Sequence, residues 1–206
     1  MGLVWLLLGA AEAESPRLGG SAMTPVWILL GVVVLLVLWF FFAYNGLVRS
    51  RNEVRNAWSQ IDVQLKRRHD LIPNLVNVVK DYMGYEQEVL QNVTKARNLA
   101  MQASGPDAAG KAEAQLSKAL SNLYVVMENY PQLKANQNVS QLQEELTSTE
   151  NKIAFARQYY NDSVMSYNTK TEVIPTNIVA NMGGFQKSEF FSAPEEEKAV
   201  PEVKLR

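Results

Sequence analysis

The sequence predicts an all-α protein: an N-terminal transmembrane helix followed by an antiparallel four-helix up-and-down bundle with long helices. Two observations predict this fold. Residues 18–48 contain no charged side chain, and behind them apolar residues recur at helical spacing without any period-two alternation. The chain has 206 residues, no cysteine and a formal net charge of −1. This composition excludes disulfides and thiolate metal sites, and it shows no basic excess that would indicate nucleic acid as a partner.

The anchor is predicted from an uninterrupted apolar run at residues 26–43. With one flanking residue at each end, the run reaches the roughly 20 residues that cross a hydrocarbon core of about 30 Å. Trp27 and Trp39 lie near its two ends, where aromatic side chains meet the membrane surface. No ionisable residue interrupts it, so it offers no proton or ion path. We expect residues 23–44 to be a single-pass anchor that contacts the lipid bilayer through residues 26–44.

Basic residues flank this anchor unequally. Arg17 alone precedes it, whereas Arg49, Arg51 and Arg55 follow it closely. The positive-inside rule therefore places the C-terminal domain in the cytoplasm.

Residues 1–22 are expected to be a leader or a dispensable N-terminal extension. An apolar run ends in Ala11-Glu12-Ala13, which resembles a signal-peptidase site, but no positively charged region precedes it. A signal peptide thus remains one interpretation. The other, which we favour, is that Met23 is the true start.

Four helices are expected in the bundle, residues 45–171, because each carries apolar residues three and four positions apart. Val54, Trp58, Ile61 and Leu65 show this spacing in the first of them. Such stripes pack against one another in a bundle. The helices are expected at about residues 44–70, 73–103, 107–130 and 131–170.

Prolines and glycines mark the breaks between these helices. Pro73 cannot donate a helical hydrogen bond, so it indicates either a tight reversal or a kink in one very long helix. Gly105-Pro106 indicates a loop, and Pro131 suits the first turn of the last helix. Connections this short make neighbouring helices antiparallel.

Residues 172–206 are expected to be a tail. Its scattered apolar residues, such as Ile178, Phe185 and Phe191, predict partial docking on the bundle or at the membrane interface. From Pro194 onward the chain is acidic and rich in proline, which predicts disorder.

No motif in the sequence indicates catalysis. Residues 105–111 match the start of a phosphate-binding loop, but Ala112 stands where a hydroxyl would ligate magnesium. His69 is the only histidine, so neither a zinc-binding histidine pair nor the Glu-x-x-His pairs of di-metal bundles occur. We therefore expect no catalytic residue, no cofactor and no metal site, and a protein that is not an enzyme.

A partner-binding surface is the functional feature that the sequence suggests. Asparagine is frequent beside the apolar stripes although helices disfavour it, and residues 66–68 form a short basic cluster. The alternative is a solvated helix end, where cations are favourable near the C-terminus. The candidate partner-binding residues are Asn52, Asn56, Arg67, Arg68, Asp70, Asn74 and Asn77.

Several stretches together resemble the LemA family of bacterial membrane proteins. They are Ala57–Arg68, Asp70–Val76 and the Thr149-Glu150-Asn151 segment of the last helix, and the resemblance runs from about Met23 to Phe191. It implies a single-pass anchor, a bundle of four long helices and a start at Met23. It assigns no activity to any residue. Some relatives are linked to membrane remodelling around organelles, and others look like companions of membrane metalloproteases.

The leading hypothesis is a membrane-anchored adaptor or scaffold at the bacterial cytoplasmic membrane, with no catalytic activity and with protein partners still unknown. The alternative is a regulatory or sensing subunit that binds a peptide or ligand, for example as cofactor of a membrane metalloprotease. The apolar stripe of the last helix serves an internal core or a coiled-coil oligomer equally well. The sequence is therefore compatible with a homo-oligomer as well as with a monomer.

Overall fold

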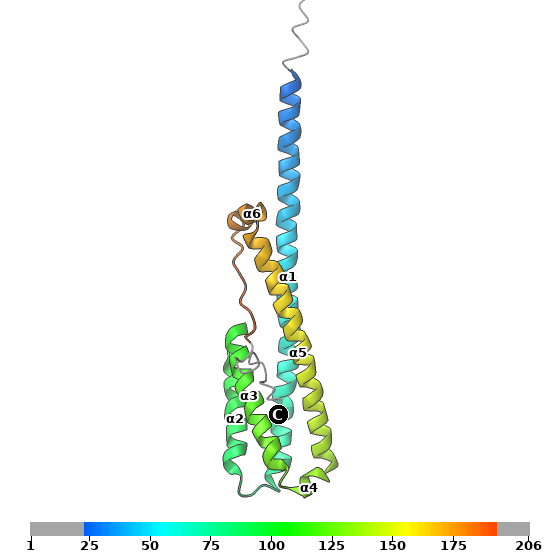
Figure 1. Cartoon of the computed structure of the whole chain (residues 1–206), viewed down its shortest axis with the longest axis vertical. Coiled ribbons are helices and arrows are strands. Elements are labelled where there is room, and N and C mark those ends of the chain that lie inside the picture. The colour runs from blue at the N-terminus through cyan, green and yellow to red at the C-terminus, as the bar shows by residue number, and fades with distance from the viewer. Residues whose placement is uncertain (1–22, 193–206) are drawn as a thin grey trace, which may run out of the picture. The chain divides into compact units, whose positions relative to one another are not determined.

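The computed structural model describes residues 23–192 (Figure 1), so the leader expected at residues 1–22 and the disorder expected from Pro194 lie outside the described residues. Within this range all regular structure is helical, which confirms the prediction of an all-α protein. The helices are α1 (Met23–Lys80), α2 (Gln87–Gln102), α3 (Pro106–Met127), α4 (Pro131–Lys134), α5 (Gln137–Glu172) and α6 (Thr176–Met182).

The chain divides after Tyr44 into two units. In the first unit, α1 contains a stretch that is long and apolar enough to cross a membrane, with a mean hydropathy of 2.9 and none of it buried in the protein. Large side chains such as Trp27, Leu35 and Phe42 are exposed there. Exposed apolar side chains in such density are stable in lipid rather than in water. The prediction of an N-terminal membrane helix is thus supported by length and composition.

Of the two alternatives at Pro73, one very long helix is confirmed, and the helix boundaries expected at residues 70 and 73 are wrong. α1 continues through Pro73 and ends at Lys80, and the chain reverses at residues 81–86 instead. A proline inside a helix removes one N–H and leaves the carbonyl four residues earlier without its partner. That carbonyl belongs to His69, and Arg97 of α2 donates an Nε–H hydrogen bond to it at 2.6 Å. The helix continues because a neighbouring helix supplies the missing donor.

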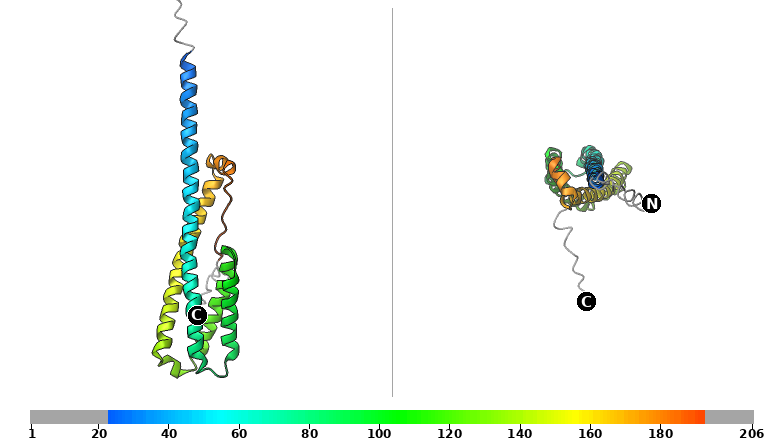
Figure 2. Two further views of the ribbon diagram at one scale, coloured as in Figure 1. Left: turned by 180° about the vertical axis from the view of Figure 1, so that it is seen from behind. Right: turned by 90° about the horizontal axis from the view of Figure 1, so that it is seen from above.

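α2 and α3 lie side by side (Figures 1 and 2) and are joined by a three-residue connection, Ala103–Gly105. Gly105 has a φ of 87°, in the left-handed region where glycine carries no steric penalty. Pro106 follows as the first residue of α3, where its missing N–H has no helical partner to lose.

The last long helix begins later than expected. Pro131 starts only the one-turn helix α4, and α5 begins at Gln137. The Asn136 side chain caps α5, because its Oδ1 accepts hydrogen bonds from the N–H groups of Asn138 at 3.0 Å and Val139 at 3.4 Å. An asparagine cap satisfies N–H groups that have no partner inside the helix.

The C-terminal part of α1 packs along α5. The rings of Trp58 and Tyr160 lie 5.6 Å apart, and Lys170 Nζ donates to Ser50 Oγ at 2.6 Å. The apolar stripes of α1, α2, α3 and α5 meet in one buried cluster, which positions the polar residues described below. Its largest fully buried members are Ile72, Leu75, Val79, Met83, Val93, Leu116, Leu123, Leu133 and Val139.

Candidate functional site

A buried cluster of polar and charged residues joins α1 to α3. Arg68 is 2% exposed, Glu113 5% and His69 8%. Arg68 Nη1 donates to Glu113 Oε2 at 3.0 Å, and His69 Nε2 lies 2.6 Å from Glu113 Oε1. Both carboxylate oxygens of Glu113 are therefore engaged by neighbouring side chains of α1.

α5 joins the same cluster through the second nitrogen of Arg68. Arg68 Nη2 donates to Ser117 Oγ at 2.9 Å and lies 2.9 Å from Glu150 Oε2. Ser117 Oγ in turn donates to Glu150 Oε1 at 3.3 Å. One guanidinium thus holds acceptors from α3 and α5 in fixed positions, as the planar fork of arginine favours.

A groove of about 660 Å³ opens beside this cluster, between α3 and α5. Its lining includes Arg68, Glu113, Ser117, Glu150 and Arg157. A smaller adjoining hollow of about 270 Å³ is lined by Arg68, Ser117, Tyr124 and Glu150, among others. Burial raises the pKa of the Tyr124 phenol, Arg68 opposes that rise, and Glu150 adds to it. The phenol therefore stays a neutral hydrogen-bonding group at the wall of the hollow.

Six of the seven candidate partner-binding residues share one face of α1. At 100° per residue they fall within an arc of roughly 80° and extend over roughly 38 Å of helix. The six are Asn52, Asn56, Arg67, Asp70, Asn74 and Asn77, and all are exposed. Arg67 forms a surface ion pair with Glu145, with 3.6 Å between Nη2 and the carboxylate. We call these six residues the α1 polar face.

Arg68 does not belong to that face. Its side chain is buried on the opposite side of α1 and is held by Glu113, Ser117 and Glu150. The sequence placed it with Arg67 because the two are adjacent in a basic cluster, but adjacent helical residues point about 100° apart. In this structure Arg68 is buried and connects α1 with α3 and α5.

Aromatic side chains of α5 border the α1 polar face. A groove of about 540 Å³ runs between the two helices, and its lining includes Asn56, Val63, Lys152, Phe155 and Tyr159. Val63 is 58% exposed and Phe155 74% exposed, although both are large and apolar. We call Val63, Phe155 and Tyr159 the apolar edge.

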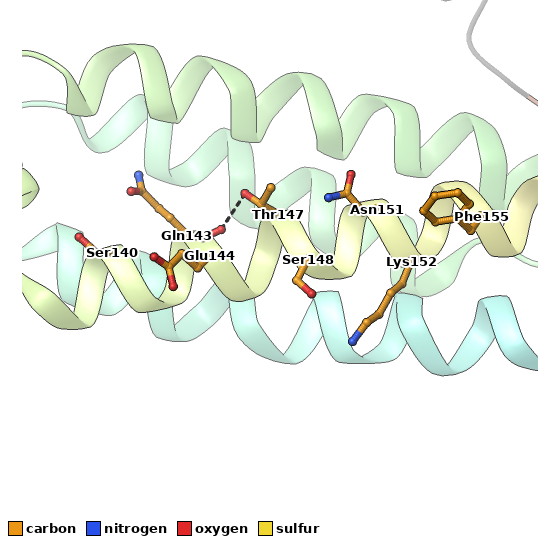
Figure 3. A pocket seen from close by; sticks show the side chains of 8 residues that line it. All are labelled: Ser140, Gln143, Glu144, Thr147, Ser148, Asn151, Lys152 and Phe155. Atoms are coloured by element: carbon orange, nitrogen blue, oxygen red, sulfur yellow. Dashed lines mark hydrogen bonds between the residues drawn. The ribbon is translucent and has the colours of Figure 1, made fainter.

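The outer side of α5 continues this surface with polar groups. Figure 3 shows Gln143, Thr147 and Asn151 on one side of the helix and Lys152 on the other. Phe155 follows Lys152 along α5. They line a shallow groove of about 730 Å³. The Thr147 hydroxyl donates to the Gln143 carbonyl at 2.8 Å, so it is engaged within its own helix.

Among the described residues, 23–192, no group of three histidine, aspartate or glutamate side chains gathers that could hold a metal ion. The charged residues of the buried cluster already bind one another across three helices. The arrangement is suited to fixing helices relative to each other.

Comparison with known proteins gives the family. Residues 57–205, most of the chain, match the sequence model of the LemA family. The chain belongs to the LemA family. The protein named LemA from Metamycoplasma hominis is 27% identical over 87% of this chain and 90% of its own length. Together with the apolar part of α1, this membership indicates a membrane-associated helical protein.

Two further relatives carry another name. The magnetosome protein MamQ of Magnetospirillum gryphiswaldense is 24% identical over 86% of this LemA-family chain and 76% of its own length. The magnetosome protein MamQ 2 of Paramagnetospirillum magneticum is 26% identical over the same shares. The likeness to each extends over most of both chains.

Sequence reasoning missed Glu113 as a partner of His69 and Arg68. The sequence did contain a signal for Glu113. This residue lies three positions before Leu116 and therefore on the apolar stripe of α3. A carboxylate at a buried stripe position requires a buried cation. The adjacent Arg68 and His69 were the candidates for that cation.

Proposed function

We propose that this LemA-family protein is a membrane-anchored adaptor or scaffold without catalytic activity of its own. In this proposal the C-terminal part of α1 forms an antiparallel four-helix bundle with α2, α3 and α5. The anchor holds that bundle on the cytoplasmic side of the bacterial cytoplasmic membrane. Arg49, Arg51 and Arg55 support this orientation through the positive-inside rule. The names of the relatives, LemA and magnetosome protein MamQ, are non-enzymatic in kind.

The observation that carries the proposal is the combination of the α1 polar face with the apolar edge. Exposed amides on one helix border exposed apolar side chains, of which Phe155 is 74% exposed. Protein interfaces have this composition, with aromatic anchors at the centre and a polar rim that satisfies hydrogen bonds. A solvated surface would leave such large apolar side chains without a compensating contact.

The buried charge cluster gives this surface rigidity. Arg68 binds acceptors on α3 and α5. These bonds fix the positions of α1 and α5, the two helices that carry the α1 polar face and the apolar edge, relative to each other. A surface fixed in this way loses little conformational freedom when a partner binds. An adaptor needs such a preorganised surface more than it needs a deep pocket.

Site-specific photo-crosslinking in intact membranes tests the proposal. A photoreactive residue is introduced at Asn56, Val63 or Phe155, and the matched control position is Asn92, which is exposed on α2. We expect the three surface positions to capture the same discrete protein partners and the control to capture none of them. Arg67→Glu should reduce the yield at all three. Equal capture from Asn92 would contradict the proposal.

The second candidate function is a regulatory or sensing subunit that binds a ligand, for example as cofactor of a membrane metalloprotease. The observation in its favour is the polar groove of about 660 Å³ beside Arg68 and Glu150. This function predicts one dominant stoichiometric partner. An adaptor predicts several partners captured from Val63, whereas this function predicts capture of its one partner from Ser121, which lines the polar groove.

A further inference from the structure

The chain after α6 lies along α5 in extended form and is recognised through its backbone. The Asn161 side chain donates to the Phe191 carbonyl at 3.2 Å and accepts the Phe191 N–H at 2.9 Å. Asn168 does the same to Ser188, with both distances 2.9 Å. Each amide therefore binds the tail as a neighbouring β-strand would. We call residues 185–192 the docked tail.

Two tyrosines add to this recognition. Tyr160 Oη donates to the Glu189 carbonyl and Tyr167 Oη to the Gln186 carbonyl, each at 2.8 Å. The two asparagines lie seven residues apart on α5, as do the two tyrosines, a helical rise of about 10.5 Å. Three residues of extended chain rise about 10 Å. The helix and the antiparallel tail thus repeat in the same register.

Among the side chains of the docked tail, those buried against the bundle lie near its two ends. Phe185 is 7% exposed and Phe191 3% exposed, whereas the side chains at 186, 187, 189 and 190 are exposed. Phe185 lies under the Arg51 guanidinium, 4.9 Å from its carbon, and Phe191 lies 6.2 Å from the Trp58 ring. We call the side chains of α1 and α5 that contact the docked tail, together with α3 at its far end, the tail groove. This groove recognises an extended backbone with two aromatic anchors six positions apart.

α3 closes the far end of the groove. Ser192 Oγ donates to Asp107 Oδ1. A Cβ on Gly110 would lie 2.5 Å from the Ser192 carbonyl oxygen and 2.8 Å from its nitrogen. Only a glycine permits this approach of two backbones, so the residue after the second aromatic anchor meets a tight contact with α3.

We propose that this groove also receives the docked tail of a second copy of the chain, so that copies of the protein exchange tails. A second copy supplies both aromatic anchors at the required spacing and the serine that reaches Asp107. Every contact of the docked tail with α1, α3 and α5 is then kept, made between chains instead of within one. The inference goes beyond the adaptor proposal, because it assigns an interaction site and its occupant.

The connection between α5 and the docked tail is the part that changes in an exchange. It contains Gly183 and Gly184, and Gly184 has a φ of 65°. The contacts with α1, α3 and α5 cancel between the two arrangements. The hydrogen bond from the Phe185 N–H to the Ala180 carbonyl of α6, at 3.0 Å, belongs to the connection. This connection and the local concentration of copies therefore decide the balance. Copies that share a membrane are concentrated in two dimensions, which favours exchange between them.

The experiment uses two full-length single-cysteine chains, because the protein has no cysteine of its own. One chain carries Asp107→Cys and the other Ser192→Cys, and both are produced in the same membrane and oxidised. Neither chain can form an internal disulfide. A control pair replaces Asp107→Cys with Asn92→Cys, on an exposed position of α2. A single chain with both Asp107→Cys and Ser192→Cys must form the internal disulfide, which verifies geometry and folding.

The expected result is about tenfold more inter-chain disulfide in the Asp107/Ser192 pair than in the control pair. The substitutions Asn161→Ala and Asn168→Ala then distinguish exchange from random collision. Placed on the Asp107→Cys chain, they damage the receiving groove and lower the yield. Placed on the Ser192→Cys chain, they free its tail and raise the yield.

Tyr160→Phe combined with Tyr167→Phe removes two hydrogen bonds from the groove and is a milder change. It should also lower the disulfide yield on the Asp107→Cys chain and raise it on the Ser192→Cys chain. A disulfide yield equal to that of the control pair would overturn the proposal. A lower yield whichever of the two chains carries the groove substitutions would overturn it as well. Capture of Ser192→Cys by a different protein would also overturn it, because the occupant would then not be a second copy. None of these outcomes depends on the crosslinks that test the adaptor function.

Discussion

Arg97 donates a 2.6 Å hydrogen bond from Nε to the carbonyl oxygen of His69, the acceptor that Pro73 leaves without a helical partner. The two residues are 28 positions apart and belong to different helices. The bond explains how α1 passes through a proline at the level of the buried charge cluster. It also ties α2 to the residue whose side chain contacts Glu113.

The first prediction is that Arg97 and Pro73 are energetically coupled. Arg97→Met should lower the free energy of unfolding by about 2 kcal/mol, because it leaves a buried carbonyl without a donor. In a Pro73→Ala background the restored N–H serves that carbonyl, so Arg97→Met should cost clearly less. A double-mutant cycle in denaturant unfolding measures the difference. Additive effects of the two substitutions would show that the hydrogen bond does not compensate for the proline.

The second prediction concerns the buried ion pair of Arg68 and Glu113. Glu113→Gln should lower the free energy of unfolding by about 3 kcal/mol, because it leaves two buried cationic or polar groups without their carboxylate. The matched control is Glu145→Gln, which breaks the exposed pair with Arg67 and should cost less than about 1 kcal/mol. Urea unfolding of the detergent-solubilised protein measures both. Equal small effects would mean that the buried cluster does not stabilise the bundle.

Much of the fold follows from helical periodicity. The stripe residues Val54, Ile61 and Leu65 are buried as their spacing predicts, and the apolar run before them is the one stretch of the described residues with a membrane-compatible composition. These features depend on residues three or four positions apart, which a sequence displays directly.

The remaining features depend on contacts between distant residues. Pro73 does not break α1 because the donor that compensates for it, Arg97, lies on another helix. The buried side chains of Phe185 and Phe191 fit the expected docking of the tail on the bundle. The path of the tail along α5 left no pattern in its sequence, because Asn161 and Asn168 bind its backbone. Arg68 was grouped with Arg67 by adjacency, although adjacent helical residues point about 100° apart. The acceptors that bind Arg68, Glu113 and Glu150, lie on other helices.

The third prediction is that Gly110→Ala releases the end of the docked tail. The added Cβ would lie 2.5 Å from the backbone of Ser192, which real contacts do not tolerate, while alanine itself favours α3 by up to about 1 kcal/mol. Hydrogen exchange should therefore become faster at the Phe191 amide and stay unchanged within α3. Gly84→Ala is the control, since nothing lies within 4 Å of its Cβ. Unchanged protection of Phe191 would contradict the close approach.

The fourth prediction concerns the pH dependence that Tyr160 gives to stability. Burial raises the pKa of its phenol to about 12, and the carboxylate of Glu189 adds to that rise. In the unfolded chain the phenol titrates near its ordinary value of about 10. Its contribution to stability is therefore complete below pH 10. It is lost as the pH rises from 10 to 12, because the unfolded chain releases the proton first.

Tyr160→Phe removes both the titrating group and its hydrogen bond to the Glu189 carbonyl. We expect the variant to be about 1 kcal/mol less stable at neutral pH. Between pH 9 and pH 11 its stability should fall less steeply than that of the unsubstituted protein. Comparing each variant with its parent at the same pH cancels the titration of the other tyrosines and of the lysines. Tyr159→Phe, at the exposed neighbouring position, should keep the parental slope. If Tyr160→Phe kept it as well, the Tyr160 phenol would not be the group that lowers the stability of the protein at alkaline pH.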